Sequence, residues 1–300
     1  MSKTALKFYL RHPGKIVLGI VNHCWFLFSD KTSLKIQYRI KMGRRLNLKN
    51  PKRFSEKLQW LKLYDRKPEY TKMVDKIAAK DYVASIIGNQ YIIPTLGTWN
   101  HFDEIDFDTL PDKFVLKTNH GGGGSAVVIC KDKSKFNKNR AKAILEHSLK
   151  HSVYSNLREW PYKNVKPMIL AEQLLEGNEN EIPDYKIFCF NGEPKFCQVI
   201  SGRKTKMCID FFDHEWIHQP FHEPRDFPFA SLEPQKPEHF EIMWEMARKL
   251  SKGHPFFRVD FYDINKELFF GELTFFPTSG MGGFDPDDYD EILGNMISLP

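Results

Sequence analysis

The chain has 300 residues, which is enough for two or three lobes around a sizeable core. Its 41% hydrophobic and 27% charged residues are typical of a soluble globular protein. The five cysteines are scattered and form no CxxC pair, which argues against a thiolate zinc site and against a disulfide scaffold. This cysteine usage fits a reducing cytoplasm.

Positive charge is concentrated at the N-terminus. Residues 1–57 carry fourteen Lys and Arg against only Asp30 and Glu56, a balance of +12, so the total of +6 leaves −6 for the other residues. A protein that grips nucleic acid through its body would carry its basic surface there. The charge distribution therefore predicts no nucleic-acid partner.

An apolar stretch lies within this basic region, at residues 15–28 (KIVLGIVNHCWFLF). It is shorter than the ~20 residues that cross a bilayer, and no small-x-small cleavage site follows it, so it is neither a span nor a signal peptide. Two hypotheses stay open. One is a buried helix; the other is an amphipathic helix that brings residues 1–48 onto the inner face of the cytoplasmic membrane.

Further along the chain, helical periodicity predicts helices over residues 31–48 with an end near Gly43, over 54–65, and over 70–87 with an end at Gly88. Short apolar runs then predict strands at 91–99, 113–120, 125–131 and 168–175. Two hairpins are predicted, at 185–202 with a turn at Asn191 and Gly192, and at 256–276 with a turn at Asn265. Further helices are predicted at 137–151 and 238–252.

Strands in runs with helices at their ends indicate an α+β fold with mixed or antiparallel sheets. Neither GxGxxG nor the Walker A pattern occurs, which argues against a dinucleotide fold and a P-loop. The predicted parts are a basic amphipathic helical segment (1–57), a helical part (58–90), a subdomain with a glycine-rich loop (91–175) and a C-terminal subdomain (176–300).

A run of glycines separates two predicted strands in FVLKTNHGGGGSAVVI, with Lys117 before it and Ser125 after it. Glycines let a loop fold its backbone N–H groups over an anion, and a lysine beside them neutralises phosphate charge. The segment therefore predicts a phosphate-binding loop, whose glycines are Gly121, Gly122, Gly123 and Gly124.

Two carboxylates, Asp260 and Glu272, lie on adjoining predicted strands among aromatic residues. Facing carboxylates repel each other in apolar surroundings unless a cation lies between them, and Mg²⁺ takes few carboxylates and completes its shell with phosphates and water. The pair therefore predicts a Mg²⁺ site, with two solvated side chains as the alternative. Glu172 and Asp184, after another strand, give a weaker signal for contacts to adenine and ribose.

In this order the segments over residues 70–300 resemble the ATP-grasp superfamily, in which two α+β subdomains clasp ATP. The resemblance implies that Lys76 (or Lys80 in its place) and Lys117 bind the nucleotide, and that the glycine-rich loop with Ser125 covers the phosphates. It further implies adenine contacts from Glu172, Gln173 and Leu175 and a ribose contact from Asp184. Lys186 and Arg258 would contact phosphate or substrate, and Asp260, Glu272 and Thr274 would lie at the metal.

Two departures from the superfamily pattern point to one branch. Glu272-Leu273-Thr274 replaces the usual Glu-x-Asn, and threonine is a weaker metal ligand; the N-terminal part reads as basic helices and not as a Rossmann-like domain. Together with PKRFSEKLQWLKLYD and GELTFFPTSG, these features resemble the TupA-like branch, named for teichuronopeptide biosynthesis and associated with bacterial capsule and cell-wall polysaccharides.

This resemblance implies an ATP- and Mg²⁺-dependent ligase that forms an amide through an acyl phosphate. Its substrates would be an amino acid and a uronic acid of a surface polysaccharide or of a lipid-linked precursor. Two alternatives stay open: a glycosyltransferase with a DxD metal site at Asp106 and Asp108, and a non-catalytic, membrane-docked assembly protein. His214, His218 and His222 recur every fourth residue, but Pro220 interrupts a helix there, which argues against a metal site.

Overall fold

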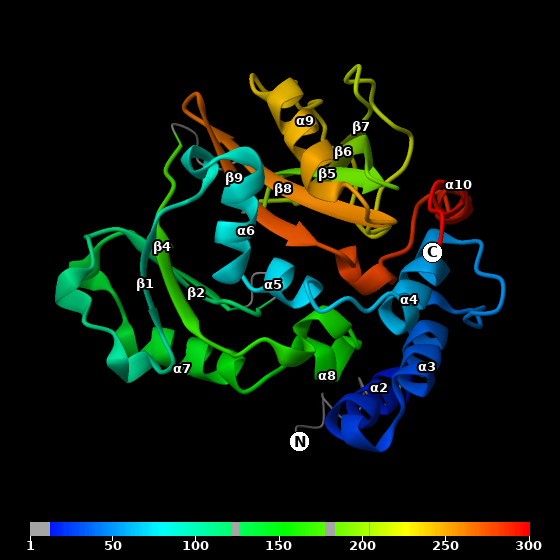
Figure 1. The fold of residues 1–300 in the computed structure, drawn as a ribbon, viewed down its shortest axis with the longest axis horizontal. Helices are drawn as coiled ribbons and strands as arrows, with labels where there is room; N and C mark the ends of the chain where they lie inside the picture. The colour runs from blue at the N-terminus through cyan, green and yellow to red at the C-terminus, as the bar shows by residue number, and fades with distance from the viewer. Residues whose placement is uncertain (1–12, 122–125, 178–183, 204) are drawn as a thin grey trace.

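A computed structural model describes residues 13–121, 126–177, 184–203 and 205–300. It contains two antiparallel sheets with helices between and around them, which confirms the α+β prediction (Figure 1). The strands of one sheet fall within the predicted 91–175 part and those of the other within 176–300. The domain boundaries themselves stay a prediction.

The four-stranded sheet has the order β1 (Thr95–Trp99), β4 (Ile169–Gln173), β2 (Phe114–Thr118), β3 (Val127–Cys130). Helix α7 (Lys138–Leu149) covers one face and buries Ala141 and Leu145 against Phe114 and Leu116. Lys117 therefore lies on the opposite face from this core, because side chains alternate along a strand.

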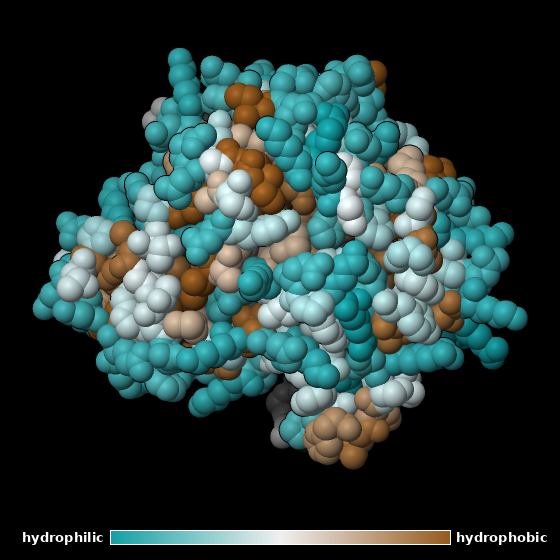
Figure 2. Space-filling view, in the orientation of Figure 1, coloured by the Kyte–Doolittle hydropathy of each residue, from teal (hydrophilic) through white to brown (hydrophobic). Residues whose placement is uncertain are grey.

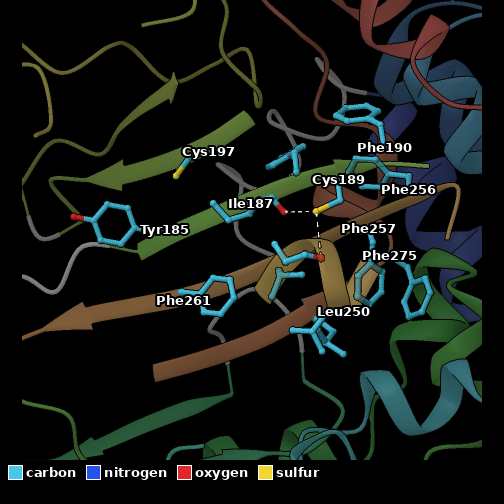
Figure 3. Close-up of a cluster of buried hydrophobic side chains, with 14 of the residues drawn as sticks. Tyr185, Ile187, Cys189, Phe190, Cys197, Leu250, Phe256, Phe257, Phe261 and Phe275 are labelled. Carbon is cyan, nitrogen blue, oxygen red and sulfur yellow. Dashed lines mark hydrogen bonds between the residues drawn. The ribbon is translucent and has the colours of Figure 1, made fainter. Parts of the chain in front are cut away.

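The five-stranded sheet has the order β7 (Cys208–Phe212), β6 (Glu193–Ser201), β5 (Asp184–Phe190), β8 (Phe256–Ile264), β9 (Glu267–Thr274). One face packs on helix α9 (Phe240–Ser251), as the Sγ atom of Cys189 on β5 lies 3.8 Å from the Ala247 carbonyl oxygen (Figure 3). Burial raises the pKa of the Cys189 thiol to about 12, so this cysteine is a core residue.

The other face of this sheet is divided along its length. Phe188, Phe190 and Phe256 form an apolar half, on which Phe54 of helix α4 (Phe54–Tyr64) packs at ring-centroid distances of 4.9 Å to Phe256 and 6.2 Å to Phe190. The polar half carries the alternate residues nearer the other end of β5 and β8. Both predicted hairpins are confirmed, with positive φ at Asn191 and Gly192 and at Asn265 and Lys266.

The N-terminal region is helical, with α2 (Pro13–His23), a 3₁₀ turn η1 (Trp25–Leu27), α3 (Asp30–Met42) and α4 (Phe54–Tyr64). The Ser29 hydroxyl caps α3 by accepting from the Thr32 amide, and Gly43 ends it with a φ of 70°. The predicted helices ending near Gly43 and spanning 54–65 are confirmed.

The prediction of one helix over 70–87 is wrong. It is broken into α5 (Tyr70–Val74) and α6 (Ala78–Ile87), which lie between the two sheets in Figure 1. At the break, Asp75 Oδ1 accepts hydrogen bonds from the Ile77 amide (2.9 Å) and from Asn119 Nδ2 (3.0 Å). Asp75 thus replaces the helical hydrogen bonding and ties the break to the end of β2, a tertiary constraint that helical periodicity does not report.

Helix α4 holds the loop that follows β9, a 3₁₀ turn η7 (Pro277–Gly280). Lys62 Nζ donates to the Ser279 carbonyl oxygen (2.8 Å) and hydroxyl (2.6 Å), and Gln59 Nε2 to the Ser279 and Gly280 carbonyl oxygens (3.1 Å each). Thr278 and Ser279 both have positive φ, a strained conformation for residues with a side chain. The α4 contacts therefore fix a strained loop in place.

Two short helices, absent from the sequence predictions, complete the fold: α8 (Val153–Leu157) and α10 (Tyr289–Asn295). The buried Asp290 of α10 accepts from the Ser55 amide (2.8 Å) and hydroxyl (2.7 Å), so the C-terminal helix caps the start of α4. No helix among the described ranges is long and apolar enough to cross a bilayer.

His254 gives a testable pH dependence. Its ring stacks on Phe257 (centroid distance 4.9 Å) and lies near Tyr70 (5.3 Å), and burial together with Lys67 lowers its pKa to about 4. Between pH 6.5 and about 4 the unfolded chain therefore binds more protons than the native protein, so the free energy of unfolding falls as the pH falls through this window. His254→Phe keeps the ring stack and is expected to reduce that fall by about 2–3 kcal/mol. Urea denaturation across the window measures it, and an unchanged pH slope would contradict the assignment.

Candidate active site

A narrow cleft lies between β2 and β4 of the four-stranded sheet and the β9 edge of the five-stranded sheet. Helices α5 and α6 form its third wall. Its apolar lining includes Val74, Ile92, Ile93, Phe270 and Leu273. Its charged lining consists of Lys76, Lys80, Lys117, Glu172 and Glu272.

At one end of the cleft, two lysines share one carboxylate. Lys117 Nζ lies 2.5 Å from Glu172 Oε2, and Lys80 Nζ lies 2.7 Å from Glu172 Oε1. Burial acts to raise the pKa of Glu172, but the two ammonium groups hold it below its ordinary value. The three side chains, each at most 15% exposed, leave a net positive charge in a place that water barely reaches.

Lys76 lies at the break between α5 and α6 and connects the two sheets. Its amide donates to the Asn119 carbonyl oxygen (3.0 Å) at the end of β2, and its Nζ donates to the Gly121 carbonyl oxygen (2.5 Å). The same Nζ lies 3.7 Å from Glu272 Oε2 on β9. The break between α5 and α6 therefore places the Lys76 ammonium group beside Glu272 of the five-stranded sheet.

Strand register brings six polar residues onto the polar half of the five-stranded sheet. Lys186 on β5 pairs with Asp260 on β8, Asp260 pairs with Glu272 on β9, and Arg258 pairs with Thr274. Asp184 lies two residues before Lys186 and so shares its face. The register shifts at Gly271, and a Cβ there would lie 3.1 Å from the Asp260 carbonyl oxygen, so this bulge needs glycine.

Asp260 is the centre of this group and is 1% exposed. Arg258 contacts both of its oxygens at 2.7 Å, and Lys186 Nζ makes a close ion pair with Oδ2. Arg258 also donates to Glu272 Oε1 (3.3 Å) and to the Thr274 hydroxyl (3.1 Å). Bidentate pairing by a guanidinium supplies the compensation that a buried carboxylate needs.

Glu272 faces the cleft with a side chain that is 39% exposed. Although desolvation acts to raise its pKa, the surrounding cations Lys76, Lys186, Arg258 and Lys117 lower it to about 2. Glu272 is therefore ionised throughout the neutral range. Its side chain is more exposed than those of Glu172, Asp184 and Asp260. Lys117 of the four-stranded sheet thus acts electrostatically on Glu272 of the five-stranded sheet.

Asp184 extends the network. Its Oδ2 lies 2.9 Å from Lys186 Nζ and 2.6 Å from Arg203 Nη2, whereas its buried Oδ1 has no hydrogen-bond partner within the described ranges. A buried carboxylate oxygen without a donor indicates that a ligand hydroxyl or cation belongs beside it.

Two other predicted site residues are placed differently. Gln173 is exposed and Leu175 half-buried, and neither lines the cleft where its walls are described. The backbone N–H of Gln173 donates to the Pro94 carbonyl oxygen (3.1 Å). Gly121 is described, but Gly122, Gly123, Gly124 and Ser125 lie outside the described residues.

Residues that the sequence analysis missed support this site. Asn119 Nδ2 donates to Asp75 and to the Lys166 carbonyl oxygen, and its Oδ1 accepts from the Met168 amide, so it holds β2, β4 and the helix break together. An amide side chain at a strand end beside the glycine run was a usable signal. Arg203 and the cleft residue Tyr162 gave no such signal, because nothing in their local sequence links them to the sheets.

Two motifs with a metal-binding pattern do not assemble a metal site. Asp106 Oδ1 accepts from the Asp108 amide (3.0 Å) and caps its own exposed turn. The three histidines point to different carboxylates, His214 to Glu241, His218 to Asp210 and His222 to Asp285. Within the described ranges no group of three or more His, Cys, Asp or Glu converges as a metal site.

The residues present nevertheless fit Mg²⁺ bound together with a polyphosphate. Mg²⁺ needs only one or two protein carboxylates beside phosphate and water ligands, and Asp260 and Glu272 are opposite each other in register. Two groups of ion pairs, one around Glu172 and one around Asp260 and Glu272, together have six cationic and four anionic side chains, a formal charge of +2, which suits a ligand of net negative charge. The cations are Lys76, Lys80, Lys117, Lys186, Arg203 and Arg258; the anions are Glu172, Asp184, Asp260 and Glu272.

Solved structures similar to the chain include ligases. D-alanine–D-alanine ligase from Bacillus anthracis matches with a TM-score of 0.43 and 16% identity over 75% of this chain and 66% of the ligase. The ligase from Helicobacter pylori matches with a TM-score of 0.40 and 16% identity, covering 82% and 69%. A RimK domain ATP-grasp protein from Sphaerobacter thermophilus has a TM-score of 0.39 and 11% identity, covering 76% and 69%. The chain thus spans about two thirds of the length of the structures it matches.

No curated protein matches the chain. The family described as TupA-like ATPgrasp matches residues 56–298, which is most of the chain and includes most of α4, both sheets and every charged residue of the cleft. The chain therefore belongs to the TupA-like ATP-grasp family.

Proposed function

We propose that the protein is an ATP-dependent ligase that joins a carboxylate to an amine through an acyl phosphate. The observation that carries the proposal is that charged side chains of both sheets and of the helix break line a single cleft. Lysines from the helix break and the four-stranded sheet face carboxylates of the five-stranded sheet, with Lys76 within 3.7 Å of Glu272. A triphosphate bound with Mg²⁺ matches such an arrangement of charge.

The proposed role of each charged side chain follows from its position in the cleft. Lys80, Lys117 and Glu172 form one ion-paired group in the cleft, whereas Lys76 and Arg258 lie beside Glu272. Asp260 and Glu272 would hold Mg²⁺, which neutralises charge on the terminal phosphates when bound. Arg258 and Lys76 would then stabilise the charge on the transferring phosphoryl group, which one substrate's carboxylate oxygen attacks as ADP leaves.

In the second step the amine attacks the acyl carbon, phosphate leaves, and an amide forms. We propose an amino acid as the amine substrate and a uronic acid of a bacterial capsular or cell-wall polysaccharide, free or lipid-linked, as the carboxylate substrate. The support for these substrates is the resemblance to the TupA-like branch; no residue of the cleft selects a particular sugar or amino acid.

A non-catalytic role remains as the competing proposal because the Thr274 hydroxyl accepts from Arg258 Nη2 at 3.1 Å and so is engaged where the superfamily places a metal-ligating asparagine. The glycosyltransferase proposal lacks such support, since Asp106 caps its own turn. Phosphate release from ATP with Mg²⁺, measured over a panel of amino acids with uronic-acid acceptors, decides between them. Release that requires both substrates supports the ligase; nucleotide binding without release supports the non-catalytic role.

The two metal carboxylates predict different outcomes on substitution. Glu272→Gln is expected to abolish phosphate release, by about a hundredfold or more, with little change in stability, because the side chain is partly exposed. Asp260→Asn is expected to abolish release and also to lower the free energy of unfolding by about 3–5 kcal/mol, because Arg258 and Lys186 lose their buried counter-charge. Phosphate release and urea denaturation measure the two effects.

Glu241→Gln is the control, since Glu241 pairs with Lys236 on the exposed face of α9. It should leave both quantities unchanged. A fully active Glu272→Gln variant would show that the metal is held elsewhere.

The two lysines of the 70–87 segment are separable by kinetics. Lys76 lies beside Glu272 and the Gly121 carbonyl oxygen, so Lys76→Met is expected to lower kcat by about a hundredfold. Lys80 pairs with Glu172, and no ion pair with Asp260 or Glu272 is found for it within the described ranges, so Lys80→Met is expected mainly to raise KM for ATP, by about tenfold. Steady-state phosphate release measures both constants. The reverse pattern would assign the phosphate-transfer role to Lys80.

A further inference from the structure

The N-terminal helices carry an exposed apolar surface, here called the N-terminal patch. It consists of Ile16, Val17 and Ile20 on α2 and Trp25, Phe26 and Leu27 in η1. Their exposed fractions run from 38% for Trp25 to 70% for Leu27. Figure 2 shows a brown area at the bottom of the molecule, where Figure 1 places these helices. Contiguous apolar side chains of this size mark an interaction surface.

A buried helix would not expose apolar side chains as the N-terminal patch does. Among residues 14–23 of α2, whose burial the structure describes, only Val21 is fully buried, at 2% exposed, while the helix packs on α3 through Gly14, where a Cβ would lie 2.9 Å from Ile40 Cγ2. Few side chains of α2 therefore pack against the rest of the protein, and the side chains that face solvent include Ile16, Val17 and Ile20. The hypothesis of a buried helix accounts for Val21 and leaves the six patch residues unexplained.

The patch is held on a rigid base. Arg158, 1% exposed, donates to the Trp25 carbonyl oxygen (2.7 Å) and lies 5.6 Å from the Trp25 ring centroid. It also lies 3.8 Å from Asp30 at the start of α3, and Asp30 in turn accepts from Arg66 (2.7 Å). The one acidic residue nearest the patch in sequence is thus engaged inward, and the aromatic residues are fixed in an exposed position.

Cationic side chains accompany the patch. Lys31, Lys35 and Arg39 recur every fourth residue along α3 and are exposed, and no carboxylate within the described ranges forms an ion pair with any of them. Exposed apolar side chains on α2 and η1 beside exposed cations on the adjoining α3 complement an anionic lipid surface, in which Trp and Phe enter the interface and Lys and Arg meet the headgroups. A second copy of the chain would bring like charges together, and nucleic acid would leave the apolar residues exposed to water.

We propose that the N-terminal patch docks the protein peripherally on an anionic bilayer, with Phe26 and Leu27 inserted at the interface and the α3 cations on the headgroups. This proposal rests on the N-terminal helices and not on the chemistry of the cleft. Helix α3 is tied to α4 by the hydrogen bond between the Tyr38 and Ser55 hydroxyls (2.8 Å), and α4 holds the loop after β9, so docking would orient the cleft relative to the lipid surface.

Co-sedimentation of the full chain with phosphatidylglycerol vesicles tests the proposal, with phosphatidylcholine vesicles for comparison. Binding is expected to phosphatidylglycerol and to weaken as salt rises, because the Debye length falls from ~10 Å at 0.1 M to ~3 Å at 1 M. Phe26→Ser with Leu27→Ser is expected to reduce the bound fraction at least about tenfold. Lys31→Glu with Lys35→Glu is expected to abolish the preference for phosphatidylglycerol.

Matched controls lie elsewhere on the surface. Leu232→Ser removes an apolar side chain that is 85% exposed, and Lys195→Glu with Lys252→Glu reverses two exposed charges. These variants should bind as the unchanged protein does, and urea denaturation of every variant reports whether the fold persists. Absent binding at low salt, binding that the patch substitutions leave intact, or a dimer that those substitutions dissociate without any vesicle binding would each overturn the proposal.

Discussion

The contact between Asp260 and its two cations is the constraint around which the cleft is built. A carboxylate at 1% exposure is stable only where the surrounding charges replace water, and removing one partner from such a group costs about 3–5 kcal/mol. Arg258 comes from the same strand and Lys186 from the next one, so the register of β5 and β8 is set by charge as well as by the apolar face. Glu272 and Thr274 then follow by register on β9.

The N-terminal helices belong to this construction. Lys62 and Gln59 of α4 donate to the carbonyl oxygens of the strained turn after β9, and Asp290 of α10 caps α4 through Ser55. Because Thr278 and Ser279 have positive φ, the turn persists only with such external contacts. The segment FSEKLQWLKLYD therefore has a structural role beyond forming α4, because its Gln59 and Lys62 hold the turn that follows β9, the strand that carries Glu272.

Much of this fold could be predicted from the sequence because its signals are local. Hairpins marked by Asn191-Gly192 and Asn265, a helix closed by Gly43, and alternation along β5 and β8 depend on neighbouring residues alone. The helix break at Asp75 could not be predicted in this way, because Asn119, some forty residues later, stabilises it. The site shows the same division: motif spacing identified Asp260, Glu272 and Lys117, while Arg203 and Tyr162 reach the cleft only through tertiary folding.

Lys76 has a mechanical consequence. Its backbone is bound to Asn119 at the end of the four-stranded sheet, while its ammonium group lies between the Gly121 carbonyl oxygen and Glu272 of the other sheet. Moving the two sheets apart must either stretch that electrostatic link or pull the helix break away from β2. The spacing of the two sheets and the electrostatic surroundings of Lys76 are therefore linked through one side chain, so a ligand group that binds this ammonium group acts on contacts to both sheets at once.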